Sequence, residues 1–141
     1  MSAFLIDTNV PSELTRSQPS PRVEAWIADP GGPLYLSVVT LGELRRGITL
    51  LPADDGRRPR LERWFREDLL TLCSGGILPL TWAIAERWGV LEAERQRRGR
   101  PLSSTDGQIA ATALEHGLTL VTRNVSDFEG LGLSIVNPWE A

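Results

Sequence analysis

Short apolar runs alternate with segments of helical periodicity along the whole chain. The expected strands are residues 3–6, 34–39, 77–80, 118–122 and 133–136. The expected helices are residues 11–14, 23–28, 40–51, 61–72, 82–98 and 107–116, with a helical turn at 126–131. Short strands that are apolar on both faces and alternate with helices are typical of a parallel sheet covered by helices. The sequence therefore predicts one domain, residues 1–141, of the α/β class, with a mostly parallel central sheet of four or five strands.

One charged position breaks this pattern at the end of the first strand. The run Phe4–Ile6 ends in Asp7, and Thr8 and Asn9 follow, which favour turns and helix caps. An unpaired buried charge is costly, so packing gives no reason for an acid at this position. In such sheets the strand ends and the following helix starts share one edge, where ligands bind. We therefore expect Asp7 to face a site.

Three other segments bring acidic or amide side chains to the same edge. Glu43 is expected in the first turn of the helix that begins at Thr40, and Asp106 at the start of the helix before the fourth strand. Asn124 and Asp127 follow that strand. Crowded carboxylates repel one another unless a cation neutralises them, and oxygen donors without histidine or cysteine suit Mg²⁺ or Mn²⁺. Such an ion can activate a water for attack on phosphorus.

Each of these residues except Asp7 also has an ordinary structural interpretation. Thr40 and Glu43 have the spacing of a capping box, in which Glu43 bonds back to the start of its own helix. Asp106 is favoured at a helix N-terminus by the helix dipole alone. Asn124 and Asp127 fit a helix cap and its partner. These alternatives stay open on the sequence alone.

The formal net charge is −3, and all 15 basic side chains other than histidine are arginines. The first cluster comprises Arg57, Arg58, Arg60, Arg63 and Arg66, and the second comprises Arg95, Arg97, Arg98 and Arg100. Glutamates interleave with the first cluster, which indicates local ion pairs on solvated helix faces. The second cluster leads directly toward Asp106, and its arginines are candidates to bind a phosphate backbone. The single cysteine and the absence of a long apolar run predict a cytoplasmic protein without a membrane segment.

Four segments carry a resemblance to a known family. They are Phe4–Asn9, Ser37–Leu44, Ser104–Ala111 and Leu120–Phe128. In this order they resemble PIN-domain proteins, and most closely the VapC toxins of bacterial toxin–antitoxin modules. Within that group the chain is similar to the FitB-like branch, which also shares Asn137-Pro-Trp139. The resemblance spans essentially the whole chain and implies a PIN-like three-layer α/β/α sandwich.

The resemblance also implies a function. It implies the toxin of a type II toxin–antitoxin system, a Mg²⁺- or Mn²⁺-dependent endoribonuclease that cuts RNA. A small VapB- or FitA-like antitoxin would neutralise it, the toxin would form a homodimer, and DNA would be contacted only through the antitoxin. The alternative is a catalytically weak PIN-like module that acts mainly through an antitoxin–DNA complex.

Residue by residue, the resemblance places Asp7, Glu43 and Asp106 at the family's catalytic, metal-binding acids. Asn124 stands where the family often has a fourth acid, and Asp127 is close enough in sequence to substitute for it. The residues expected to orient the carboxylates are Thr8, Asn9 and Thr122.

Overall fold

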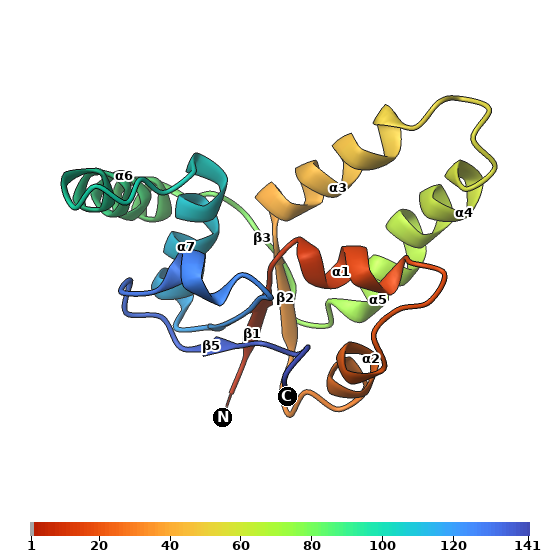
Figure 1. The fold of residues 1–141 in the computed structure, drawn as a ribbon, viewed down its shortest axis with the longest axis horizontal. Helices are drawn as coiled ribbons and strands as arrows, with labels where there is room; N and C mark the ends of the chain where they lie inside the picture. Colours follow the sequence, from red (N-terminus) through yellow and green to blue (C-terminus); the bar gives the residue numbers. More distant parts are fainter. Residues whose placement is uncertain (1) are drawn as a thin grey trace.

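The computed structural model describes residues 2–141, in which five strands form one parallel sheet (Figure 1). The strands are β1 (Phe4–Ile6), β2 (Leu34–Ser37), β3 (Gly76–Leu78), β4 (Thr119–Val121) and β5 (Ile135–Val136). Their order across the sheet is β3-β2-β1-β4-β5, and every neighbouring pair is parallel. The chain adds strands to one side of β1 and later to the other side. The carboxyl end of β1 is therefore the topological switch point at which sheets of this class bind ligands.

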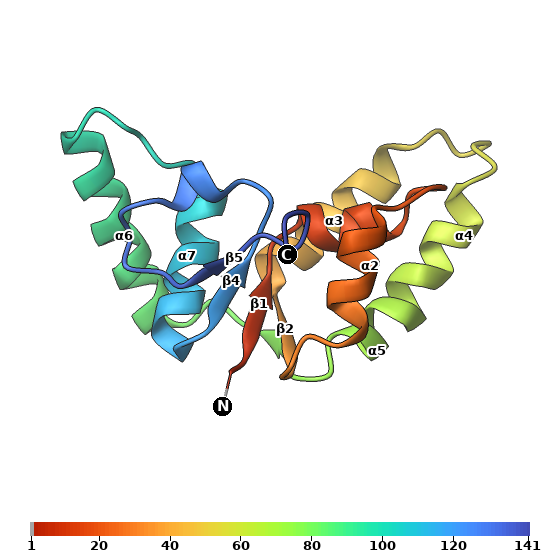
Figure 2. The ribbon, with the colours of Figure 1, turned by 60° about the horizontal axis from the view of Figure 1, so that its bottom comes forward.

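The helices form layers on both faces of the sheet, as expected. They are α1 (Asn9–Leu14), α2 (Pro21–Ala28), α3 (Val38–Leu50), α4 (Arg58–Arg63), α5 (Leu69–Leu72), α6 (Trp82–Arg97) and α7 (Ser104–His116). A π-helical turn at Trp64–Asp68 joins α4 to α5, and a 3₁₀ turn covers Val125–Phe128. In Figures 1 and 2, α6 and α7 lie on one side of the sheet and α1 to α5 on the other. The three-layer α/β/α prediction is confirmed.

Side chains on the central strands alternate between two apolar cores. Leu5 and Leu120 point into the core under α6 and α7, while Phe4, Ile6 and Val121 point into the core under α1 to α5. Because side chains in a strand alternate between faces, a short strand that is apolar throughout can serve both cores. This arrangement holds the ends of β1 and β4 rigidly between two packed layers.

The start of α3 differs from the sequence prediction. Helix α3 begins at Val38, whereas the sequence placed Val38 and Val39 in the strand and began the helix at Thr40. Ser37, the last residue of β2, is the N-cap of α3, and its hydroxyl accepts a hydrogen bond from the Val39 amide at 3.1 Å. The cap outweighs the strand preference of two β-branched valines. This shift changes the position of Glu43 within its helix.

Three arginines of the first cluster form the predicted local ion pairs, Arg57 with Asp55 and both Arg58 and Arg66 with Glu62. Both oxygens of Glu62 accept hydrogen bonds at 2.8 Å from the guanidinium of Arg45, which also stacks on Phe65 at 4.6 Å. Arg58 and Arg66 approach the same carboxylate at 4.0 and 3.8 Å. Because Arg45 belongs to α3 and Glu62 to α4, this group joins the two helices. Within residues 2–141, no helix combines the length and apolar character that a bilayer crossing requires.

Two helical glycines give a matched test of the packing between α6 and α7. A Cβ at Gly107 would lie 2.6 Å from Cδ1 of Trp88, whereas a Cβ at Gly89 would meet no atom within 4 Å. We expect Gly107→Ala to destabilise the protein by about 1–3 kcal/mol through overpacking. Gly89→Ala should stabilise it by about 0.5–1 kcal/mol, because alanine favours helix. Urea unfolding of both variants checks this, and equal effects would contradict the packing at Gly107.

Candidate active site

Asp7 stands at the carboxyl end of β1 and is only 5% exposed. Its Oδ1 accepts a hydrogen bond from the Thr8 amide at 2.8 Å, and its Oδ2 accepts one from the Thr122 hydroxyl at 2.8 Å. Burial raises the pKa of Asp7 to about 6, although these two hydrogen bonds oppose the shift. The charges of Asp106 and Glu43 raise it further. The fold thus holds a carboxylate in an environment that favours its neutral form.

The residues predicted to orient the carboxylates contact them. The Asn9 amide donates to Oδ2 of Asp7 and to the Thr122 hydroxyl, both at 3.3 Å. The Thr122 hydroxyl also accepts from the backbone amide of Asn124 at 3.0 Å. The Thr8 hydroxyl donates to Glu43 across the gap between β1 and α3. Each of the three supporting residues therefore connects Asp7 with another segment of the site, Thr8 through its backbone amide and its hydroxyl together.

Glu43 does not form the capping box that its sequence allowed. The cap of α3 is Ser37, and Thr40 lies inside the helix with its side chain fully buried. Glu43 is consequently in the second turn of the helix, not the first, and its exposed carboxylate accepts from Thr8. Its structural alternative is excluded, and its side chain faces the end of β1.

Asp106 lies in the first turn of α7, which the Ser103 hydroxyl caps by accepting from the Asp106 amide at 3.1 Å. The pKa of Asp106 is raised, first by burial and then by the charges of Asp127 and Glu43. A hydrogen bond from Ser103 and the charge of Arg95 lower it. The helix dipole favours an acid at this position, but the charges of the neighbouring acids also raise the pKa of Asp106.

Asn124 and Asp127 do not form the predicted cap and partner. Asn124 precedes the 3₁₀ turn, but its side chain makes no capping hydrogen bond there. It lines the same hollow as Asp7. Asp127 is exposed, and its charge reaches Asp106, although it does not line that hollow.

These residues surround one hollow of about 410 Å³. Its walls are formed by Asp7, Thr8, Asn9, Ser12, Glu43, Thr105, Asp106 and Asn124. The sequence prediction missed Ser12 and Thr105. Their signals were present, since Ser12 follows Thr8 by one helical turn and Thr105 precedes Asp106. In the described part of the chain, no three acidic, histidine or cysteine side chains are already grouped around one point as ligands of an ion. The acids line a shared cavity at some distance from one another.

The second arginine cluster divides into two kinds of residue. Arg97 and Arg98 are exposed at the end of α6, and Arg100 is exposed with one nitrogen 3.4 Å from the Ser126 carbonyl oxygen. Arg95 is only 6% exposed, and its guanidinium donates to backbone carbonyls of three residues. The expectation that Arg95 contacts an RNA backbone does not fit this geometry, because its donors are buried and occupied.

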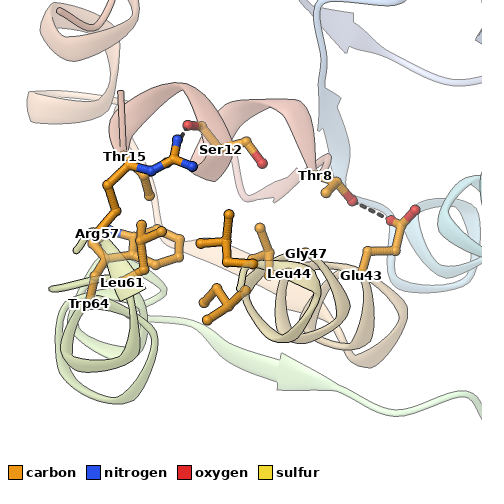
Figure 3. A pocket seen from close by; sticks show the side chains of 11 residues that line it. Thr8, Ser12, Thr15, Glu43, Leu44, Gly47, Arg57, Leu61 and Trp64 are labelled. Atoms are coloured by element: carbon orange, nitrogen blue, oxygen red, sulfur yellow. Dashed lines mark hydrogen bonds between the residues drawn. The ribbon is translucent and has the colours of Figure 1, made fainter. Parts of the chain in front are cut away.

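A second cavity, a groove of about 220 Å³, opens beside Glu43 between α1, α3 and α4 (Figure 3). Leu44, Leu61 and Trp64 form part of its apolar lining, Glu43 lies at one end and Arg57 at the other. We call it the α3–α4 groove. It connects the acidic hollow with an apolar surface, because Glu43 and Thr8 belong to both.

Comparison with known proteins agrees with the fold and with the four sequence segments. The PIN domain family model matches residues 4–130. The chain belongs to the PIN-domain family. It is 39% identical to the VapC ribonuclease Y4jK of Sinorhizobium fredii, with 97% of this chain and 98% of that protein covered. It is 36% identical to the toxin FitB of Neisseria gonorrhoeae, with 96% and 98% covered.

Solved structures give the same result for this PIN domain. The crystal structure of FitAcB from Neisseria gonorrhoeae matches with a TM-score of 0.85 at 35% identity, covering 98% of this chain and 99% of that chain. The structure of FitAB bound to an IR36 DNA fragment matches with a TM-score of 0.84 at 34% identity, covering 96% and 95%. The resemblance read from the four segments is confirmed at the level of family and fold.

The raised pKa of Asp7 predicts how the stability of the metal-free PIN domain depends on pH. The pKa is 3.8 in the unfolded reference and about 6 in the folded state, so the folded protein holds the proton more tightly. The stabilisation is complete below pH 4 and is lost as pH rises through 6, a decrease of up to about 3 kcal/mol. Asp7→Asn, which cannot ionise, should remove most of this decrease and be more stable than wild type at pH 7.

Urea unfolding in EDTA from pH 4 to pH 8 measures this effect. Asp54→Asn, at an exposed site in the loop before α4, is the matched control and should keep the wild-type pH profile. Parallel profiles for wild type and Asp7→Asn would contradict the raised pKa.

Proposed function

We propose that this PIN domain is the toxin of a type II toxin–antitoxin system and acts as a metal-dependent endoribonuclease. The observation that carries the proposal is the buried carboxylate of Asp7 at the switch point of the sheet. Within residues 2–141 no ion pair to it is recorded, and the charges of Glu43 and Asp106 raise its pKa further. Such a cluster is costly for a purely structural protein, and a bound cation relieves the cost. Relatives named as ribonucleases and as a toxin support the same activity.

The donor set fits a hard divalent cation. Asp7, Glu43 and Asp106 would supply carboxylate oxygens, and Asn124 would add an amide oxygen that can hold coordinated water. Asp127 lies outside the lining of the hollow and adds negative charge near Asp106. Mg²⁺ or Mn²⁺ bound there would supply a water activated for attack on a phosphodiester and would stabilise the leaving oxygen. The Glu43 carboxylate that would hold such an ion is the one that accepts the hydrogen bond from the Thr8 hydroxyl.

Two further groups of residues have roles in the proposed reaction: those that orient Asp7 and those that bind RNA. Thr122 and Asn9 hold the Asp7 carboxylate in one orientation, which fixes the direction of its free lone pairs. Arg97, Arg98 and Arg100 lie exposed at the end of α6 and in the loop that leads to α7. They are the proposed contacts to the RNA backbone, because a guanidinium matches a phosphate with two parallel hydrogen bonds.

Partner and assembly follow from the same family. The two matched Neisseria structures are described as FitAcB and as FitAB bound to DNA, and a VapBC from Salmonella typhimurium is described as DNA-bound. We propose that this chain forms a homodimer in the cytoplasm and binds a small antitoxin through which DNA is contacted. The α3–α4 groove suits an apolar antitoxin segment, because it is lined by Leu44, Leu61 and Trp64 and ends at Glu43.

The nuclease activity is tested with purified protein freed of antitoxin and a fluorescent single-stranded RNA. We expect cleavage in Mg²⁺ or Mn²⁺, none in EDTA, and a loss of more than about 100-fold in Asp7→Ala. A loss of that size corresponds to removing several kcal/mol of metal-dependent stabilisation of the transition state. Glu24→Ala, at an exposed acid on α2, should cleave like wild type. If wild type and Asp7→Ala behaved alike, the chain would be a binding module that acts through its antitoxin and DNA.

The antitoxin contact is tested at Gly47, an exposed helical residue that lines the α3–α4 groove. A Cβ at Gly47 meets no atom within 4 Å, so a side chain can leave the helix at this position, where the residue lines the groove. We expect Gly47→Phe to weaken binding of the proposed antitoxin at least about 10-fold, because it displaces one buried apolar group. Calorimetric titration measures this affinity. Gly47→Ala is the matched control, and equal affinities for both variants would remove the groove from the interface.

A further inference from the structure

Arg95 lies in the last turn of α6, with its side chain buried under two loops. Its Nε donates to the carbonyl oxygen of Arg100 at 2.9 Å. Both terminal nitrogens lie 3.3 Å from the carbonyl oxygen of Asp127, and Nη1 lies 3.4 Å from that of Glu129. A single guanidinium therefore connects the end of α6, the loop after it and the 3₁₀ turn near the C-terminus.

The partners of Arg95 are unusual for a buried arginine. Among the described residues, every recorded ion pair involves another arginine, and the contacts of Arg95 are all to backbone carbonyls. Burying a cation without a carboxylate is costly unless its hydrogen bonds are satisfied and negative charge is close. That charge is available from Asp106, whose pKa Arg95 lowers. The Arg95 cation thus acts on Asp106 through its charge, and no ion pair between the two is recorded.

The two segments that Arg95 joins adjoin residues of the hollow: one leads into α7, which carries Thr105 and Asp106, and the other follows Asn124. The loop after α6 returns to the helix through a hydrogen bond from the Arg100 amide to the Arg95 carbonyl at 3.0 Å, and it leads to Ser103, the cap of α7. The 3₁₀ turn begins directly after Asn124 and contains Asp127. Neither segment belongs to the sheet, so strand pairing does not fix one relative to the other.

We propose that Arg95 is a positioning residue that clamps these two segments together, so that Asp106 and Asn124 face one cavity opposite Asp7. The inference rests on the proposed metal site for its functional consequence and on the hydrogen bonds alone for the clamp. Arginine is required because its planar fork directs several donors to carbonyls on two segments at once. Lysine keeps the charge but offers a single nitrogen, and methionine fills the space with neither charge nor donors.

The experiment compares wild type with Arg95→Lys, Arg95→Met and Arg87→Met, all purified free of antitoxin. Arg87→Met is the matched control. Arg87 lies on α6, like Arg95, but it is exposed and forms an ion pair with Glu115 of α7. The first readout is hydrogen exchange of backbone amides in the metal-free proteins. In both Arg95 variants we expect the segment 125–129 to exchange at least about 10-fold faster, while β1 and β4 keep wild-type protection. In Arg87→Met all of these segments should exchange as in wild type.

The second readout is Mn²⁺ affinity, measured by electron paramagnetic resonance without RNA. We expect it to weaken about 10–100-fold in Arg95→Met, as for other residues that orient metal ligands, and less in Arg95→Lys. Folded Arg95 variants with wild-type exchange at 125–129 and wild-type Mn²⁺ affinity would overturn the proposal. If Arg95→Met does not fold, Arg95→Lys decides by the same two measurements. Failure of wild type to bind Mn²⁺ would refute the proposed function, and the exchange data would still decide the clamp.

Discussion

The burial of the Asp7 carboxylate is the constraint to which the rest of the structure is related, because a charged group is costly to remove from water. Asp7 ends the central strand, so neither core can move aside to let solvent reach it. Thr122 and the Thr8 amide hold the carboxylate oxygens but do not fully compensate for burial, since the pKa remains raised to about 6. The charged form of Asp7 is therefore destabilised by burial, and the charges of Asp106 and Glu43 destabilise it further. A buried acid with a raised pKa is typical of functional sites, because stability alone would favour an apolar residue there.

The order of the strands explains why residues far apart in sequence meet at Asp7. Strand β2 pairs with one side of β1 and β4 with the other, so α3 and the segment after β4 begin at the same edge. Helix α7 runs into β4 and packs on α6, which brings Asp106 to that edge from the other layer. The site is thus built from both helical layers and needs no long loop of its own.

Much of this arrangement was predictable from local patterns in the sequence. Apolar runs located the strands, and Asp7 was conspicuous because an acid at a strand end has no packing explanation. The register of Glu43 was not predictable, because it depends on whether Ser37 or Thr40 caps the helix, and both residue types are good caps. Only the packed structure decides between them.

Arg95 shows a different limit of sequence interpretation. It follows Ile84, Trp88 and Leu91 at helical spacing, so its place on the buried face was visible in the pattern. Its charge and the three arginines that follow it predicted instead that Arg95 would be exposed to solvent and would bind phosphate. Burial of an arginine depends on partners such as the Asp127 carbonyl, which are distant in sequence and carry no residue-specific signal. Side-chain periodicity was the better guide here than residue class.

The ion pair between Arg45 and Glu62 has a consequence for whatever occupies the α3–α4 groove. It joins the two helices that form the walls of the groove, with two short hydrogen bonds and an aromatic ring stacked on the guanidinium. The width of the groove is therefore set before any partner arrives. Most of the conformational entropy lost on binding is therefore that of the incoming segment, because the groove already has its final shape. A partner that is disordered when free would bind through its sequence-specific fit to a rigid template, and small changes in that sequence would separate cognate from non-cognate pairs.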